Sequence, residues 1–189
     1  MTNPNHQVAK PGDIFLLLVP SAQELHRLNT WQSGLQARFG GRVVPNPHIT
    51  CQRFTPGRGK SANDCVGQLS THLASIRTFQ IYTDRLIQFY APYWQNHVLR
   101  WRVQESDEYA EFRDRLEIAL QHIRCPSHFN RRRHASCTAI ELDQPTRLPL
   151  ESAESGYPIP LFLARTLWIS ELQADHQFSI LETIYFRQD

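Results

Sequence analysis

Pro47-His48-Ile49-Thr50-Cys51 is a stretch whose pattern the chain uses twice, because Arg133-His134-Ala135-Ser136-Cys137 repeats the order His, any residue, hydroxyl residue, Cys. In a β-strand, alternate side chains point to the same face. Each stretch therefore predicts a strand with a polar face, which carries the histidine and the hydroxyl, and an apolar face, which carries the cysteine. Two such histidine and hydroxyl pairs suit acid–base chemistry at a phosphate.

The residues before each motif predict a strand and a capped helix. The apolar run Ile14–Val19 is typical of a buried strand, and Ser21 with Glu24 forms a capping box that begins a helix ending at a Gly-Gly pair. Before the second motif, His97–Val103 alternates as a strand does, and a helix is expected over Asp107–Ile123. Each motif thus closes a β-α-β set.

These two sets predict an internal duplication. The two motif histidines are separated by an offset of 86 residues, from 48 to 134, and the opening strands by a similar offset. Shifting an extended segment, Thr78–Tyr90, by the same offset reaches the first arm of a C-terminal hairpin. We therefore expect an α+β fold in which two β-α-β lobes, related by a pseudo-twofold axis, line a central cleft with antiparallel sheets. The expected organisation is a flexible tail at 1–12 and a single bilobal domain at 13–189.

The remaining segments complete this outline. The further elements expected from pattern are a strand at Arg42–Val44, the first motif strand at His48–Phe54, a helix at Ser61–Ile76, the second motif strand at His134–Leu142, a surface loop at Asp143–Pro160, and a hairpin with arms Leu161–Leu172 and Gln177–Phe186.

Composition narrows the class of protein. The formal net charge of +2 is too small for a protein that coats nucleic acid. The longest apolar run, Ile14–Pro20, is too short to cross a bilayer. Four cysteines without a dense spacing pattern favour a reducing compartment. We expect a cytoplasmic monomer with no membrane partner.

With these features the chain resembles the 2H phosphoesterases, which include the 2′-5′ RNA ligase-like proteins and the RNA 2′,3′-cyclic phosphodiesterases. Their mark is two His-x-Thr/Ser-x motifs on the strands of two lobes. Pro47–Thr50 matches closely, as do the opening strand Phe15–Pro20 and the closing hairpin, and the resemblance covers most of 14–186.

The resemblance implies a function and a set of catalytic residues. His48 would protonate the leaving ribose oxygen, and His134 would activate water, for which an unperturbed pKa of about 6.5 suits both rings. Thr50 and Ser136 would donate hydrogen bonds to the phosphate oxygens. The expected substrate is an RNA end or small nucleotide with a 2′,3′-cyclic phosphate or a 2′-5′ linkage, and no metal or other cofactor is expected.

Six other residues are candidates for substrate binding. Gln52 is expected on the face of the first motif strand that carries its histidine. Phe15 and Phe54 are candidates for stacking on a base, together with the turn residues at 93 and 94. Arg132, within a run of three arginines, is expected to attract a phosphate backbone.

The second motif departs from the common pattern, and it leaves alternatives open. Arg133 replaces the usual proline, Ala135 a larger apolar residue, and Ser136 a threonine. One alternative is a nucleotide- or RNA-binding module of the same fold with weak or no catalysis, and another is reversible 2′-5′ RNA ligation. A rival from a different class is a zinc site made of two ligand pairs, Cys125 with His128 and His134 with Cys137. Packing is favoured over redox chemistry for the two motif cysteines.

Overall fold

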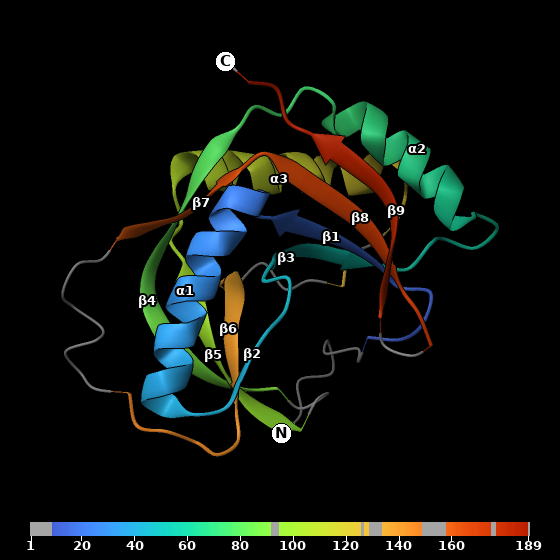
Figure 1. Ribbon diagram of the computed structural model, residues 1–189. Coiled ribbons are helices and arrows are strands. Elements are labelled where there is room, and N and C mark those ends of the chain that lie inside the picture. The colour runs from blue at the N-terminus through green and yellow to red at the C-terminus, as the bar shows by residue number, and fades with distance from the viewer. Residues whose placement is uncertain are drawn as a thin grey trace.

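The computed structural model describes residues 9–91, 95–125, 127–128, 134–148, 158–174 and 177–188. Within them the chain forms a curled antiparallel sheet and three helices (Figure 1). The strands are β1 (Ile14–Val19), β2 (Arg42–Val43), β3 (Ile49–Phe54), β4 (Phe79–Ala91), β5 (Asn96–Val103), β6 (Ser136–Leu142), β7 (Ile159–Ala164), β8 (Thr166–Leu172) and β9 (Phe178–Tyr185). The helices are α1 (Ala22–Phe39), α2 (Ala62–Leu73) and α3 (Asp107–His122).

The order of the strands confirms the predicted twofold relation. The sheet runs β7-β4-β5-β6-β3-β1-β8-β9, and β2 pairs with β6. Counting outward from the centre, β6 and β3 occupy equivalent places, as do β5 and β1, β4 and β8, and β7 and β9. The two β-α-β sets are β1-α1-β3 and β5-α3-β6. The predicted lobes therefore share one continuous sheet.

Serines begin all three described helices. The side chains of Ser21, Ser61 and Ser106 each accept a hydrogen bond from a backbone N–H of the first turn. In α1 and α2 an acidic residue three positions later completes a capping box. The helix expected at Ser61–Ile76 ends earlier, at Leu73, and Ile76 lies beyond its end in the core, where it is only 3% exposed.

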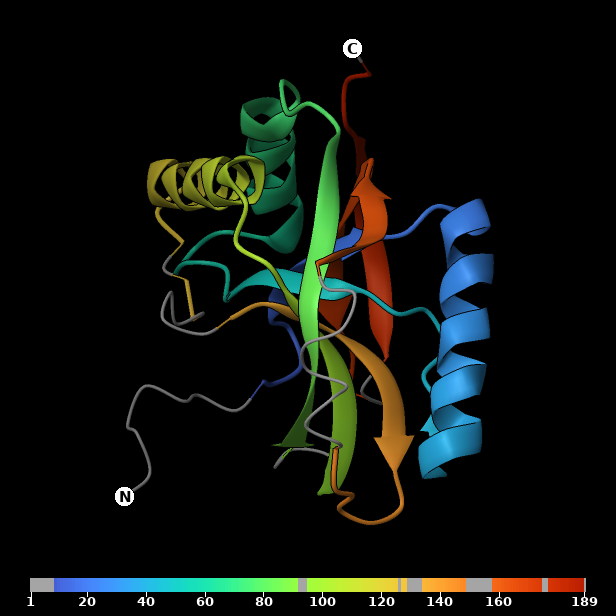
Figure 2. The same cartoon turned by 90° about the vertical axis from the view of Figure 1, so that its left-hand side faces the viewer.

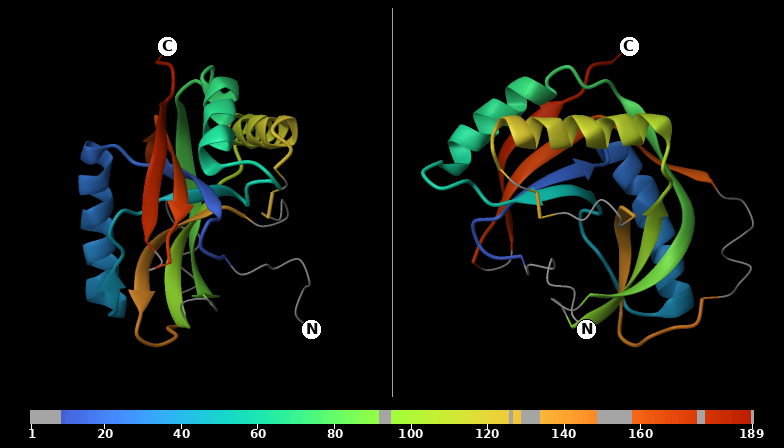
Figure 3. Two further views of the ribbon diagram at one scale, coloured as in Figure 1. Left: turned by 90° about the vertical axis from the view of Figure 1, so that its right-hand side faces the viewer. Right: turned by 180° about the vertical axis from the view of Figure 1, so that it is seen from behind.

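The C-terminal hairpin differs from its prediction. The arm expected at Leu161–Leu172 is two strands, β7 and β8, separated only by Arg165. β7 pairs with β4 at one end of the sheet, and β8 pairs with β1 near the other end. Because a single residue joins them, the sheet must curl to bring its ends together, as Figure 3 shows. A continuous apolar run does not reveal such a change of partner.

The helices α1 and α3 each reach a strand of the other β-α-β set. α1 follows β1 but contacts β6 and β2, and its Trp31 ring lies 6.1 Å from the ring of Trp101 in β5. α3 follows β5, yet its Tyr109 interacts with Cys51 of β3. Figure 2 shows the strands between α1 on one side and α2 with α3 on the other. This crossing ties the two halves together. In the described chain no helix is both long and apolar enough to cross a membrane.

The two faces of the sheet have different surroundings. The main core joins buried apolar side chains of all three helices to one alternating set of strand residues, which includes Leu16, Ile49 and Cys137. The opposite face carries a smaller apolar cluster around Phe15 and Leu17. We call this second face the motif face. Alternation along β3, β5 and β6 places on it His48, Thr50, Val98, Arg100, Arg102, Ser136 and Thr138.

Candidate active site

The two motif strands lie side by side at the centre of the sheet. β3 and β6 are antiparallel and pair at Ile49 and Cys137. Continuing this register places Thr50 opposite Ser136, with the hydroxyls of both motifs on the motif face. The structure thus brings the two halves of the duplicated pattern together where the pseudo-twofold axis crosses the sheet.

Register with β5 extends this arrangement into two rows across three strands. Thr138 pairs with Arg100, and Ser136 pairs with Arg102. One row across β3, β6 and β5 is His48, Thr138 and Arg100. The next row is Thr50, Ser136 and Arg102. Both rows combine a motif residue of β3, a hydroxyl of β6 and an arginine of β5.

A tight turn orients the ring of His48. Asn46, between two prolines, has a φ of 53°, a left-handed conformation that asparagine tolerates better than most residues. Its carbonyl oxygen lies 3.0 Å from Nδ1 of His48. Because a carbonyl can only accept, Nδ1 carries the proton and, in the neutral ring, Nε2 is left as the acceptor.

The surroundings of His48 favour its neutral form. Burial lowers the pKa of the ring, the hydrogen bond to the Asn46 carbonyl opposes this effect, and the charge of Arg100 lowers the pKa further. His48 also lies edge-on to Phe178 of β9, with ring centroids 5.9 Å apart. Together these effects favour the uncharged ring of His48 in the free protein.

His134 has a different setting. The second motif strand was expected to start at His134, but β6 begins at Ser136, and the histidine is exposed. Its neighbour Ala135 is held in place, because the carbonyl of Ala135 accepts a hydrogen bond of 2.9 Å from the backbone N–H of Val103. His134 thus stands at the entrance to the strand that carries Ser136.

A β-bulge overturns the expected position of Gln52. Leu17 pairs with Thr50 but Leu16 pairs with Gln52, so Cys51 is an extra residue in β3. The alternation shifts there, and Gln52 aligns with a residue of the main core instead of sharing the face of Thr50. It is 6% exposed and accepts a hydrogen bond from the Ser127 hydroxyl. An extra residue in one strand leaves no signature in the hydrophobic pattern.

The aromatic residues beside the site are not the pair that the sequence predicts. Phe54 is 0% exposed in the main core, away from the motif face, so the structure does not bring it to the site. Phe15 lies on the motif face but is only 9% exposed. Phe178 packs edge-on against Phe15, with ring centroids 5.0 Å apart, and is 38% exposed. The sequence reasoning missed Phe178, which is the more accessible ring beside His48.

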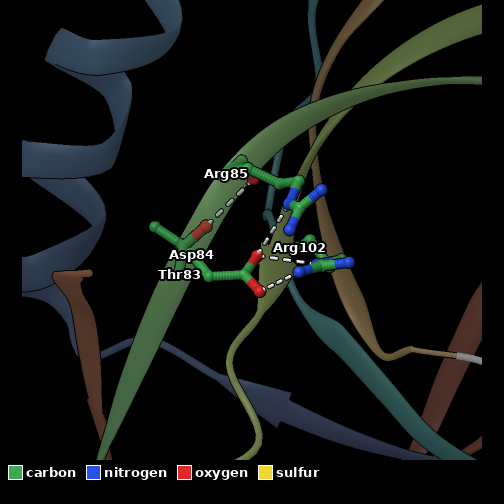
Figure 4. A network of polar contacts seen from close by, with 4 residues as sticks. All are labelled: Thr83, Asp84, Arg85 and Arg102. Carbon is green, nitrogen blue, oxygen red and sulfur yellow. Dashed lines mark hydrogen bonds and ion pairs between the residues drawn. The ribbon is translucent and has the colours of Figure 1, made fainter. Parts of the chain in front are cut away.

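The sequence reasoning also missed the arginines of β5. Arg102 is held by a carboxylate of β4: its Nε donates to Asp84 at 2.7 Å, and a second nitrogen donates to the other carboxylate oxygen (Figure 4). Arg100 lies over the ring of Phe89, 4.7 Å from its centroid. The alternation of Val98, Arg100 and Arg102 against apolar residues was the available signal, since it placed both cations on one face.

The basic run expected to attract phosphate, including Arg132, lies outside the described residues, as do the turn residues at 93 and 94.

The four residues of the zinc alternative lie in separate surroundings. The sulfur of Cys125 is 3.5 Å from that of Cys65 inside the core. Nε2 of His128 is 2.8 Å from the hydroxyl of Thr55. Cys137 is 0% exposed in the main core, whereas His134 is exposed. No cluster of three or more metal-binding side chains occurs in the described part of the chain.

The motif cysteines are packing residues, as predicted. Cys51 is 2% exposed and Cys137 is 0% exposed. Burial raises the pKa of each thiol to about 12. Since the thiolate is the reactive form, both side chains act as small apolar groups.

No family model matches the sequence, and neither does any curated protein. Solved structures do match over nearly the whole chain. The apo crystal structure of LigT from E. coli aligns with a TM-score of 0.61 and 15% identity over 95% of this chain and 100% of its own. The TT0787 protein of Thermus thermophilus aligns with a TM-score of 0.62 and 16% identity over 94% of this chain and 99% of its own.

A further solved structure and several LigT complexes are also similar to this chain. The phosphodiesterase (PDE) domain of MHV ns2 aligns with a TM-score of 0.51 and 14% identity over 94% of this chain and 100% of its own. LigT has also been crystallised with 3′-AMP, phosphate, NADP+ and ATP. At sequence identities this low, the matches show a shared fold, and they agree with the curled sheet and three helices described above. The chain therefore has the fold of the 2H phosphoesterases.

Proposed function

We propose that this protein is a metal-independent phosphodiesterase that hydrolyses a 2′,3′-cyclic phosphate or a 2′-5′ linkage at an RNA end or in a small nucleotide. The observation that carries the proposal is the pairing of β3 with β6, which sets Thr50 opposite Ser136 between the two motif histidines. The nucleotides and phosphate in the LigT crystals support the same chemical class of ligand.

In the proposed reaction each motif contributes one proton-transfer group and one hydrogen-bond donor. Thr50 and Ser136 donate to the non-bridging oxygens and stabilise the charge that grows there. His134 removes a proton from water, and His48 protonates the departing ribose oxygen. Although burial favours a neutral His48, an anionic phosphate beside the ring favours the protonated form and so prepares it to donate.

The aromatic residues give the nucleoside a place next to the phosphate. Phe178 is partly exposed and edge-on to both His48 and Phe15. A base resting on Phe178 keeps its ribose close to His48, which supports a nucleotide over a smaller phosphodiester as the substrate.

A substrate screen tests the proposal. Purified protein in EDTA is given the four nucleoside 2′,3′-cyclic phosphates and a 2′-5′ dinucleotide, and the position of the remaining phosphate is read from the products. Turnover of at least one of these compounds is expected. Nucleotide binding without any turnover would favour the binding module, and joining of cyclic-phosphate and 5′-hydroxyl ends would favour ligation.

A further inference from the structure

Arg100 extends the motif face away from the reacting centre. It lies in the same row as His48, two strands away, with Thr138 between them. Neighbouring strands are about 4.8 Å apart, so the two Cα positions are separated by about 10 Å. The backbone of Arg100 is thus two strands from that of His48, and the motif hydroxyls of β3 and β6 are closer to the reacting phosphate.

The side chain of Arg100 is held in a defined place. Its guanidinium lies over the ring of Phe89 in β4, and Phe89 pairs with Val98, which is 3% exposed. Stacking on an aromatic ring uses the face of a guanidinium, whereas a phosphate is bound by its edge, so the two contacts are compatible in one arginine. The backbone of β5 is fixed on both sides by β4 and β6.

The charge of Arg100 acts on groups of both motif strands. Its charge affects both His48, on the motif face, and Cys137, in the strand between them. Arg102, in the adjacent row, is engaged by both carboxylate oxygens of Asp84 and is therefore a fixed part of the sheet. These positions divide the motif face into an aromatic half at β9 and β1 and a cationic half at β5.

We propose that Arg100 forms a subsite for a second, non-reacting phosphate of the substrate. This inference rests on the proposed function. With a base on Phe178 and the cyclic phosphate between Thr50 and Ser136, the 5′ side of the ribose is the remaining point at which the substrate carries a phosphate. The preferred substrates are then nucleotides with a 5′-phosphate or the ends of oligonucleotides, and simple nucleoside cyclic phosphates are poorer.

The experiment compares two substrates that differ in one group. One is the nucleoside 2′,3′-cyclic phosphate that is turned over best, and the other is the same compound with a 5′-phosphate. The wild type is expected to prefer the second in kcat/KM by about tenfold, which corresponds to about 1.4 kcal/mol. Arg100→Gln should abolish the preference, mainly through KM, whereas Arg115→Gln on the exposed side of α3 should keep it. Added salt should weaken the preference of the wild type.

The outcomes separate this inference from the proposed function. Equal kcat/KM for the two substrates in the wild type, or a preference that survives in folded Arg100→Gln protein, overturns the subsite and leaves the phosphodiesterase standing. Absence of turnover for both substrates overturns the phosphodiesterase proposal. If Arg100→Gln fails to fold by circular dichroism, Arg100→Lys replaces it, and a reduced preference is expected because a point charge lacks the planar fork.

Discussion

At the scale of single residues, the site depends on what surrounds each histidine. His48 is oriented by the carbonyl of Asn46, half-buried, and close to the charge of Arg100. His134 is exposed at the start of its strand. The repeated pattern predicts both histidines and both hydroxyls as catalytic residues, and their roles remain a prediction. It could not predict that the two histidines differ in burial, because burial depends on neighbours that are distant in the chain.

The pH dependence of catalysis should reflect the lowered pKa of His48. The profile of kcat/KM reports the free protein, and His48 must be protonated to act as the acid. The limb that His48 controls, in which its proton is lost as the pH rises, should therefore have a midpoint below 6.5. Arg100→Gln removes a positive charge that favours the neutral ring, and the same limb should move to higher pH. Profiles measured across acidic and neutral pH check this. A limb that is unchanged in Arg100→Gln protein would contradict the electrostatic account.

The second motif has a serine, Ser136, where the common motif has a threonine, and substitutions there test whether this hydroxyl serves catalysis. Ser136→Thr keeps the hydroxyl and restores the common motif, so activity should be retained. Ser136→Ala removes the donor and should lower kcat about 10²-fold, as loss of one oxyanion donor does in other enzymes. Rates for both variants with the best substrate of the screen decide the matter. Equal activity of the two variants would exclude Ser136 as a phosphate donor.

At the scale of elements, most strands and helices follow from pattern, and the exceptions share one cause. The capped helices and the alternating strand β5 are local features, and they were predicted. The bulge at Cys51 and the break at Arg165 arise from how strands pair with distant partners. Because of the bulge, Gln52 leaves the motif face, and a correct strand prediction still gave one wrong position.

The junction of β2 and β6 gives a prediction about stability. Gly41 has a φ of 84°, and a Cβ atom there would lie 1.9 Å from the carbonyl oxygen of Glu141. Gly41→Ala should lower the free energy of unfolding by about 1–3 kcal/mol or more. Gly34 lies in α1 with open space around it, so Gly34→Ala should raise that free energy by about 0.4–1 kcal/mol. Urea unfolding of both variants measures the two changes in the free energy of unfolding. A Gly41→Ala protein as stable as the wild type would show that β2 packs differently.

At the scale of the whole molecule, two similar halves share one core. The main core contains buried residues of all three helices and of both motif strands, and α1 lies over the strands of the other half. The duplication was predictable because it repeats in sequence at a constant offset. The crossing of the helices and the single continuous sheet were not, since the two halves do not record in their sequences how they pair.

This shared core predicts that the halves unfold together. Thermal or urea unfolding should give a single transition, with coincident curves from circular dichroism and tryptophan fluorescence. Trp31 and Trp101 come from different halves and lie against each other, so fluorescence reports their contact. Two separated transitions would mean that each lobe is stable alone.

The central claim is that two histidines from the two halves act on one phosphate. The most direct measurement is kcat/KM for the best substrate of the screen in EDTA, with the wild type, His48→Ala, His134→Ala and the double variant, all checked for folding. The account predicts a loss of about 10²–10⁴-fold in each single variant and a far smaller additional loss in the double variant, because the two groups act in one reaction. Wild-type rates in either single variant, or a wild type that is inactive in EDTA, would contradict it.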